Sequence, residues 1–128
     1  MTFDFHLNDQ SGYIYDVDLH DFDERVIRAS EAKPVLVDFW AEWCSPCLVI
    51  APVLSQVVAS YEGDVCLAKL EVDEGENMKL AGRYKVRGFP TIILFEQGEP
   101  VAHFSGVKMQ HQIEHFIDEH SEILRQGK

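Results

Sequence analysis

The chain has little cysteine, few positive charges and no long hydrophobic run. Three of its 128 residues are cysteines, and 11 basic residues stand against 22 acidic ones, a formal net charge of −11. A partner with a phosphate backbone would require a basic stripe, so we expect no nucleic-acid partner. The longest apolar stretch, Cys47 to Leu54, is interrupted by Pro52 and is far shorter than the roughly 20 residues of a membrane span. We therefore also expect no membrane association.

The first residues lack the features of a secretory leader. Met1 to His6 contains neither a basic segment nor the start of an apolar one. Together with the acidic composition, this predicts a soluble, cytoplasmic protein. In a reducing compartment, so small a number of cysteines favours catalytic use over structural cross-linking.

Length and composition bound the domain organisation. The chain is 46% apolar, enough for one domain with a sizeable core, and it has no internal repeat or low-complexity segment. We expect an N-terminal extension over residues 1–12, a single domain over 13–122 and a short C-terminal tail over 123–128.

Hydrophobic periodicity predicts an alternation of strands and helices. Because this order requires a sheet covered by helices on both faces with right-handed crossovers, the predicted fold class is α/β. The expected strands are 13–17, 35–40, 65–72, 91–95 and 100–104, and the expected helices are 18–30, the cysteine turn to 61, 76–84 and 112–124.

The most informative stretch is Trp43-Cys44-Ser45-Pro46-Cys47, which lies between a predicted buried strand and a predicted helix. Residues three apart share a helix face, about 5–6 Å apart at Cβ, so the two sulfurs can bond with little backbone change. Cys44 would lie at the helix N-terminus, where unpaired N–H groups favour a thiolate and lower the thiol pKa from about 8.5. This pattern predicts a dithiol–disulfide exchange centre.

Other uses of these residue types fit the sequence less well. A zinc site usually needs a second CxxC or a histidine pair, whereas a structural disulfide across a two-residue gap would constrain the unfolded chain little. Cys66 lies in a predicted strand and is interpreted as a small buried side chain. His111, His115 and His120 are interpreted as solvated surface residues rather than metal ligands. The acidic loop 71–76 is likewise interpreted as solvated.

Four segments in order resemble the thioredoxin family over about residues 13–122. They are Val37-Asp38-Phe39-Trp40-Ala41, the Trp-Cys-x-Pro-Cys centre, Arg87-Gly88-Phe89-Pro90-Thr91 and Gly106. The resemblance implies the thioredoxin fold, a central mixed sheet of four or five strands flanked by four helices. It also implies a dithiol at the C-terminal end of the second strand.

The resemblance implies a role for each residue of the catalytic centre. Cys44 would attack a substrate disulfide, Cys47 would resolve the mixed disulfide, Asp38 would be the general base for Cys47, and Lys69 would be the charge partner of Asp38. A carboxyl group within a strand of Val, Leu and Phe is desolvated, which raises its pKa toward the working pH. The alternative is that Asp38 and Lys69 point into water at strand ends.

The resemblance also implies a substrate-binding rim. Pro90 would follow a cis peptide bond, and the backbones of Phe89 and Pro90 would pair with an extended substrate segment like an added strand. The substrate would bind to an apolar rim around the dithiol, which consists of Trp43, Gly88, Phe89, Gly106 and Val107.

The implied function is reduction of protein disulfides without a bound cofactor. Electrons would come from a flavoprotein that resembles thioredoxin reductase. Ser45 and Leu48 depart from the family's usual glycine and basic residue, and the loss of a nearby cation should weaken thiolate stabilisation at Cys44. Residues 13–43 also resemble the domain that begins a group of bacterial co-chaperones. An adaptor or holdase that binds clients through the apolar rim is therefore the alternative.

Overall fold

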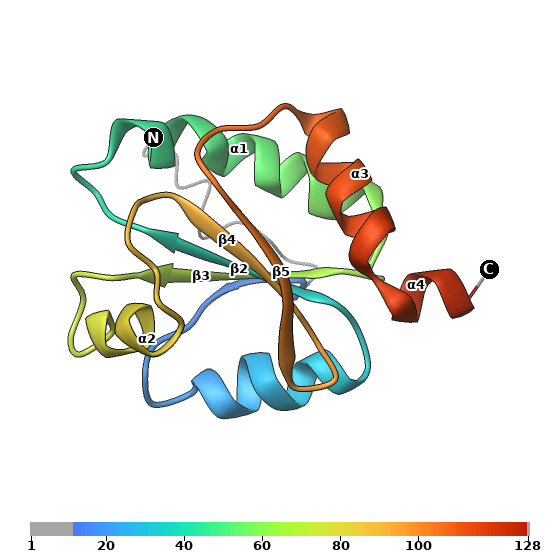
Figure 1. The fold of residues 1–128 in the computed structure, drawn as a ribbon, viewed down its shortest axis with the longest axis horizontal. Coiled ribbons are helices and arrows are strands. Elements are labelled where there is room, and N and C mark those ends of the chain that lie inside the picture. Colours follow the sequence, from blue (N-terminus) through green and yellow to red (C-terminus); the bar gives the residue numbers. More distant parts are fainter. Residues whose placement is uncertain (1–11, 128) are drawn as a thin grey trace.

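A mixed five-stranded sheet forms the centre of the computed structural model, which describes residues 12–127 (Figure 1). The strand order is β1-β3-β2-β4-β5, in which β3 is parallel to β1 and β2, while β4 is antiparallel to β2 and to β5. The predicted fold class is confirmed. The predicted extension 1–12 lies outside the described residues except for Gly12. The strands are β1 (Ile14–Asp16), β2 (Val35–Trp40), β3 (Cys66–Glu71), β4 (Thr91–Glu96) and β5 (Glu99–Ser105).

Helices cover both faces of the sheet (Figure 1). On one face lie α1 (Ser45–Ser60) and α3 (Gln110–His120), and α4 (Glu122–Gln126) continues from α3. On the other face lie α2 (Met78–Arg83) and a helical segment made of η2 (Asp23–Arg28) and η3 (Ala29–Glu31). Among residues 12–127, no helix is both long and apolar enough to span a bilayer.

The central strand β2 lies between two hydrophobic clusters and leads directly into the turn that contains Cys44. Side chains alternate along a strand, so Leu36 packs against α1 and α3 while Val37 and Phe39 pack against η2 and α2. Five of the six β2 residues are buried, as expected for a strand covered on both faces. This burial fixes the position of Asp38 and of the turn that follows β2.

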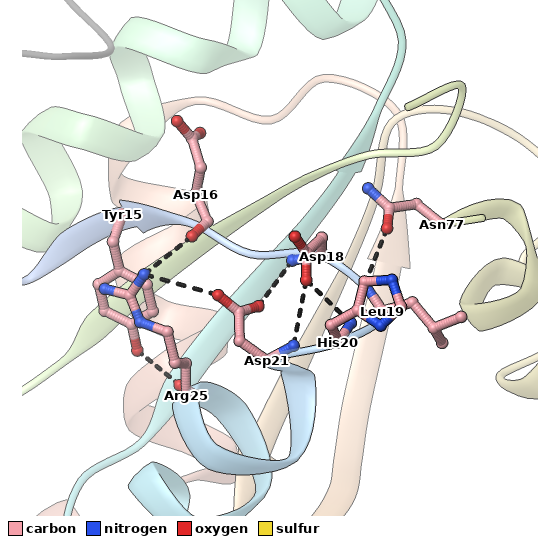
Figure 2. A network of polar contacts seen from close by, with 8 residues as sticks. All are labelled: Tyr15, Asp16, Asp18, Leu19, His20, Asp21, Arg25 and Asn77. Carbon is pink, nitrogen blue, oxygen red and sulfur yellow. Dashed lines mark hydrogen bonds and ion pairs between the residues drawn. The ribbon is translucent and has the colours of Figure 1, made fainter. Parts of the chain in front are cut away.

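The first helical segment begins later than the predicted helix 18–30, and its geometry is not α-helical. It is a π-helical stretch followed by a 3-10 turn. Short polar side chains hold the preceding residues in a turn (Figure 2): Asp18 Oδ1 accepts from the Asp21 amide at 3.1 Å, and Asp21 Oδ1 accepts from the Asp18 amide at 2.8 Å. The buried Asn77 Oδ1 accepts from the Leu19 amide at 2.8 Å and ties this turn to the start of α2.

The predicted final helix 112–124 is broken into α3 and α4. Ser121 between them is extended, with φ −87° and ψ 111°. The cause is the buried carboxylate of Glu96, which accepts from the Ser121 hydroxyl and from the backbone amides of Glu122 at 3.0 Å and Ile123 at 3.3 Å. These bonds satisfy N–H groups that begin a new helix, so the chain turns at Ser121.

Candidate functional site

The two cysteines of the CxxC motif lie at the start of α1, directly after β2 and its three-residue turn. A disulfide joins Cys44 to Cys47, with their Cα atoms 5.3 Å apart. Cys44 is the N-cap of α1, and its sulfur accepts a hydrogen bond from the Cys47 amide at 3.2 Å. The predicted strand-to-helix position and the predicted ability of the two sulfurs to bond are therefore confirmed.

The first turn of α1 creates an environment for a negative sulfur. Pro46 occupies the first turn, and the amides of Cys47 and Leu48 both point back at Cys44, donating to its carbonyl at 3.0 Å and 3.3 Å. N–H groups at a helix N-terminus stabilise negative charge, and here one of them already points at the Cys44 sulfur. Cys47 is 1% exposed and Cys44 is 5% exposed, so Cys44 is the more accessible of the two.

Asp38 and Lys69 are both buried beneath this turn. They stand opposite each other in the parallel pair β2–β3, with Asp38 1% exposed and Lys69 9% exposed. The alternative that both side chains point into water is therefore wrong. Asp38 Oδ1 has no hydrogen-bond partner among the described residues. Burial raises the pKa of Asp38 to about 7, against the opposing effect of the Lys69 charge.

A cleft of about 400 Å³ reaches from the surface to Asp38 and Cys47. Besides Asp38, four acidic side chains line it together with Lys69, and burial followed by the charge of Glu42 raises the pKa of Glu71. Sequence reasoning missed this acidic cleft because its carboxylates come from three separate segments that meet only in the folded structure. The four acidic residues are Asp16, Glu42, Glu71 and Glu74.

Trp43 is held in place at the edge of the dithiol. It is 66% exposed, and its indole Nε1 donates to Asp73 Oδ2 at 2.6 Å. Its ring lies edge-to-face with Phe89, the ring centroids 5.9 Å apart. Asp73 lies in the loop interpreted as merely solvated, so its contact with Trp43 is a feature that the sequence reasoning missed.

The segment opposite Trp43 contains the cis peptide bond Phe89–Pro90 that the resemblance implied. The Pro90 carbonyl accepts from the Gly106 amide at 3.0 Å, and Gly106 has φ +85°, which suits glycine. The Pro90 carbonyl is thus occupied, contrary to the expectation that both residues offer backbone groups. Among the described residues the Phe89 backbone makes no hydrogen bond, and Val107 beside Gly106 is 48% exposed.

The third cysteine lies outside this centre. Cys66 begins β3 and is only partly buried, so the expectation of a buried side chain is wrong. Because it is the first residue of its strand, it packs at the margin of the core rather than within it. Between Gly12 and Gly127, no group of three or more His, Cys, Asp or Glu side chains is arranged to hold a metal ion.

Comparison with known proteins agrees with this geometry. A family model described as Thioredoxin matches residues 14–119. The chain is also similar to curated proteins named Thioredoxin from Staphylococcus aureus strains Mu50, MW2 and N315. Each is 43% identical over 100 residues, an alignment that covers 78% of this chain and 90% of the relative.

Proposed function

Since the chain belongs to the thioredoxin family, we propose that its Cys44–Cys47 dithiol reduces disulfide bonds of protein substrates. Two electrons and two protons pass to the substrate, which leaves as two thiols, while the protein acquires the disulfide present in this structure. The observation that carries the proposal is the Cys44 sulfur at the N-terminus of α1, within hydrogen-bond distance of the Cys47 amide.

The reaction has two exchange steps. The Cys44 thiolate attacks one sulfur of the substrate disulfide, and the other substrate sulfur departs with a proton. The Cys47 thiolate then attacks the Cys44 sulfur of this mixed disulfide and releases the second substrate thiol. The greater exposure of Cys44 supports its assignment as the attacking residue and the burial of Cys47 supports its assignment as the resolving one.

We assign Asp38 as the base that takes the proton of Cys47. Both residues line the same cleft, and an acid with a pKa of about 7 can exchange protons near neutral pH. Lys69, opposite Asp38 in β3, limits how far burial raises that pKa. Lys69 acts through Asp38 and has no contact with the substrate in this proposal.

An apolar rim around Cys44 would hold the substrate. The unpaired backbone of Phe89 can bond an extended segment, and Asp73 fixes the orientation of the exposed Trp43. Pro90 and Gly106 are bonded to each other, so they shape the rim rather than pair with the substrate. The proposed rim consists of Trp43, Gly88, Phe89, Pro90, Gly106 and Val107.

The proposed partners are protein disulfides and a reductase. The two sulfurs carry the electrons themselves, so this chain needs no bound cofactor. A flavoprotein resembling thioredoxin reductase would restore the dithiol, and the reducing cytoplasm is the proposed location. The comparisons give no support to the adaptor interpretation.

Substitution of each cysteine tests the function and the order of the steps. We expect Cys44→Ser to abolish the catalysis by this protein of insulin-disulfide reduction, with dithiothreitol as the electron donor. We expect Cys47→Ser, mixed with a disulfide substrate without dithiothreitol, to accumulate a mixed disulfide that is visible on a non-reducing gel. Cys66→Ser is the matched control and should retain turnover. Capture of substrate by the unmodified protein without turnover would favour the adaptor, and absence of a trapped species would contradict the assigned order.

A further inference from the structure

A second groove, of about 490 Å³, lies between the segment 84–88 and the strands β4 and β5. Its floor is formed by strand residues such as Ile93 and Ala102. Lys85, Arg87 and His103 also line it, whereas no aspartate or glutamate does. In a chain of net charge −11, this groove is a local concentration of positive charge.

Lys85 and Arg87, the two permanent cations of this groove, form no ion pair within the part of the chain that the structure describes. Within residues 12–127, neither Lys85 nor Arg87 has a carboxylate within 4.0 Å, and both side chains are exposed. Of the other exposed cations in residues 12–127, some are paired with nearby acids, as in Lys79–Glu76 at 3.0 Å and Arg125–Glu122 at 2.8 Å, whereas others such as Arg28 have no carboxylate within 4.0 Å. What distinguishes this groove is that two exposed, unpaired cations lie two residues apart and line the same hollow, where both are available to an external anion.

The backbone of Lys85 is set by the end of α2. Lys85 has φ +60°, in the left-handed region that glycine adopts more readily than any residue with a side chain. Lys85 follows the C-cap residue Tyr84, and the Val86 amide donates to the Ala81 carbonyl at 2.8 Å, so this conformation is the left-handed turn that commonly ends a helix. The Lys85 side chain lines the basic groove.

The basic groove is continuous with the rim around the dithiol. Gly88 lines the groove and directly precedes Phe89, and Ser105 lines it and directly precedes Gly106. The sheet order places the groove at the β4–β5 edge, whereas the acidic cleft lies toward β1 and β3, with β2 and the dithiol between them. The surface is therefore positive on one side of the dithiol and negative on the other.

We propose that the basic groove binds an acidic, extended segment of the protein substrate that flanks the disulfide to be reduced. Carboxylates of that segment would pair with Lys85 and Arg87, and its backbone would continue toward Phe89. The acidic cleft would repel the same segment and so fix the direction in which the substrate lies. This inference rests on the proposed disulfide reduction and adds a preference among substrates.

The test uses the reduced full chain and peptides that contain one cysteine in a disulfide with thionitrobenzoate. Attack by Cys44 on the peptide sulfur releases coloured thionitrobenzoate, and Cys47 then releases the peptide thiol. One peptide carries glutamates before the cysteine, a second carries them after it, and each is matched by a peptide with glutamines. We expect one acidic peptide to react roughly two- to fivefold faster than its glutamine match at low salt, because surface ion pairs are weak and screened.

Lys85→Gly is the decisive variant, because it removes the charge while giving the backbone its preferred residue. Because glycine suits φ +60°, we expect the fold to be retained, so that a loss of preference reports on the groove. We expect Lys85→Gly and Arg87→Gln each to reduce the preference, and the double variant to abolish it. Lys33→Gln, which removes a lysine outside the groove, should leave the preference unchanged.

The outcomes separate this inference from the proposed function. Exchange with the glutamine peptides but no preference for either acidic peptide overturns the groove assignment and leaves the function standing. A preference that survives in the Lys85→Gly, Arg87→Gln double variant also overturns it. If even the glutamine peptides do not react, the proposed function itself fails.

Discussion

Asp38 and Glu96 are buried carboxyl groups in neighbouring strands of one sheet, yet their surroundings are opposite. Asp38, in the middle of β2, has one oxygen without a hydrogen-bond partner among the described residues and faces the cleft below the dithiol. Glu96, at the end of β4, accepts three hydrogen bonds from Ser121, Glu122 and Ile123. Both are less than 5% exposed.

The difference shows how its surroundings can suit a buried carboxyl group either to proton exchange or to stabilising the fold. A buried carboxylate that accepts several N–H and O–H bonds stabilises the groups that donate them. A buried carboxyl without such bonds ionises reluctantly, so it can exchange a proton near neutral pH at the expense of stability. These surroundings support the proposed role of Asp38 in the reaction and a structural role for Glu96.

The largest expected difference between the two carboxyl groups is in the rate of the resolving step. Asp38→Asn should slow the resolving step on the order of 100-fold near neutral pH, because an amide cannot take the Cys47 proton, while the initial attack by Cys44 changes little. Stopped-flow single-turnover exchange separates the two phases. Glu96→Gln is the matched control and should change neither. Equal slowing of both phases, or unchanged rates, would remove Asp38 from the mechanism.

The second effect is thermodynamic and should appear at Glu96. Glu96→Gln keeps the shape of the side chain but replaces one acceptor oxygen with a donor that faces other donors. We expect the free energy of unfolding to fall by about 2–3 kcal/mol, as for loss of charge-assisted bonds at a buried site. Urea denaturation measures this change. A variant within ~0.5 kcal/mol of the parent would show that the Glu96 bonds add no net stability.

The burial of Asp38 could be predicted from the sequence, whereas the hydrogen bonds of Glu96 could not, for a physical reason. Asp38 stands within a continuous apolar run beside the cysteine motif, so its burial follows from its immediate neighbours. Glu96 follows the predicted strand 91–95 and looks like a turn residue. Its partners lie 25 to 27 residues further along the chain, and no local pattern records that pairing.

The same division holds for the rest of the site. The strand-to-helix position of Cys44 and the five-stranded sheet follow from periodicity and motif spacing. The bond from Trp43 to Asp73 joins residues 30 positions apart, and the bond from the Gly106 amide to the Pro90 carbonyl links two segments that are also distant in the sequence. Contacts of this kind depend on tertiary packing, which single-sequence patterns do not encode.

A smaller effect of opposite sign should appear at Asp38. The pKa of Asp38 rises from 3.8 to about 7 on folding, so the folded state binds the proton more tightly than the unfolded state does. The free energy of unfolding therefore falls as the pH rises from about 4 to about 7, because Asp38 must ionise in its buried position. Asp38→Asn removes this penalty but leaves a buried amide. We therefore expect a gain of roughly 2 kcal/mol at pH 8 and no gain at pH 4. Urea denaturation at both pH values checks this, and a pH-independent difference would contradict the raised pKa.

The smallest effect isolates one bond of the Glu96 cluster. The Ser121 hydroxyl donates to Glu96 and accepts from the Leu124 amide at 3.1 Å, so it caps α4. Ser121→Ala should lower the free energy of unfolding by about 1 kcal/mol, the typical cost of losing an N-cap, because Glu96 keeps its two backbone donors. In the Glu96→Gln background the same substitution should cost less, since the two side chains share a bond. If the two losses simply add, the hydroxyl acts as a helix cap alone and the coupling to Glu96 is absent.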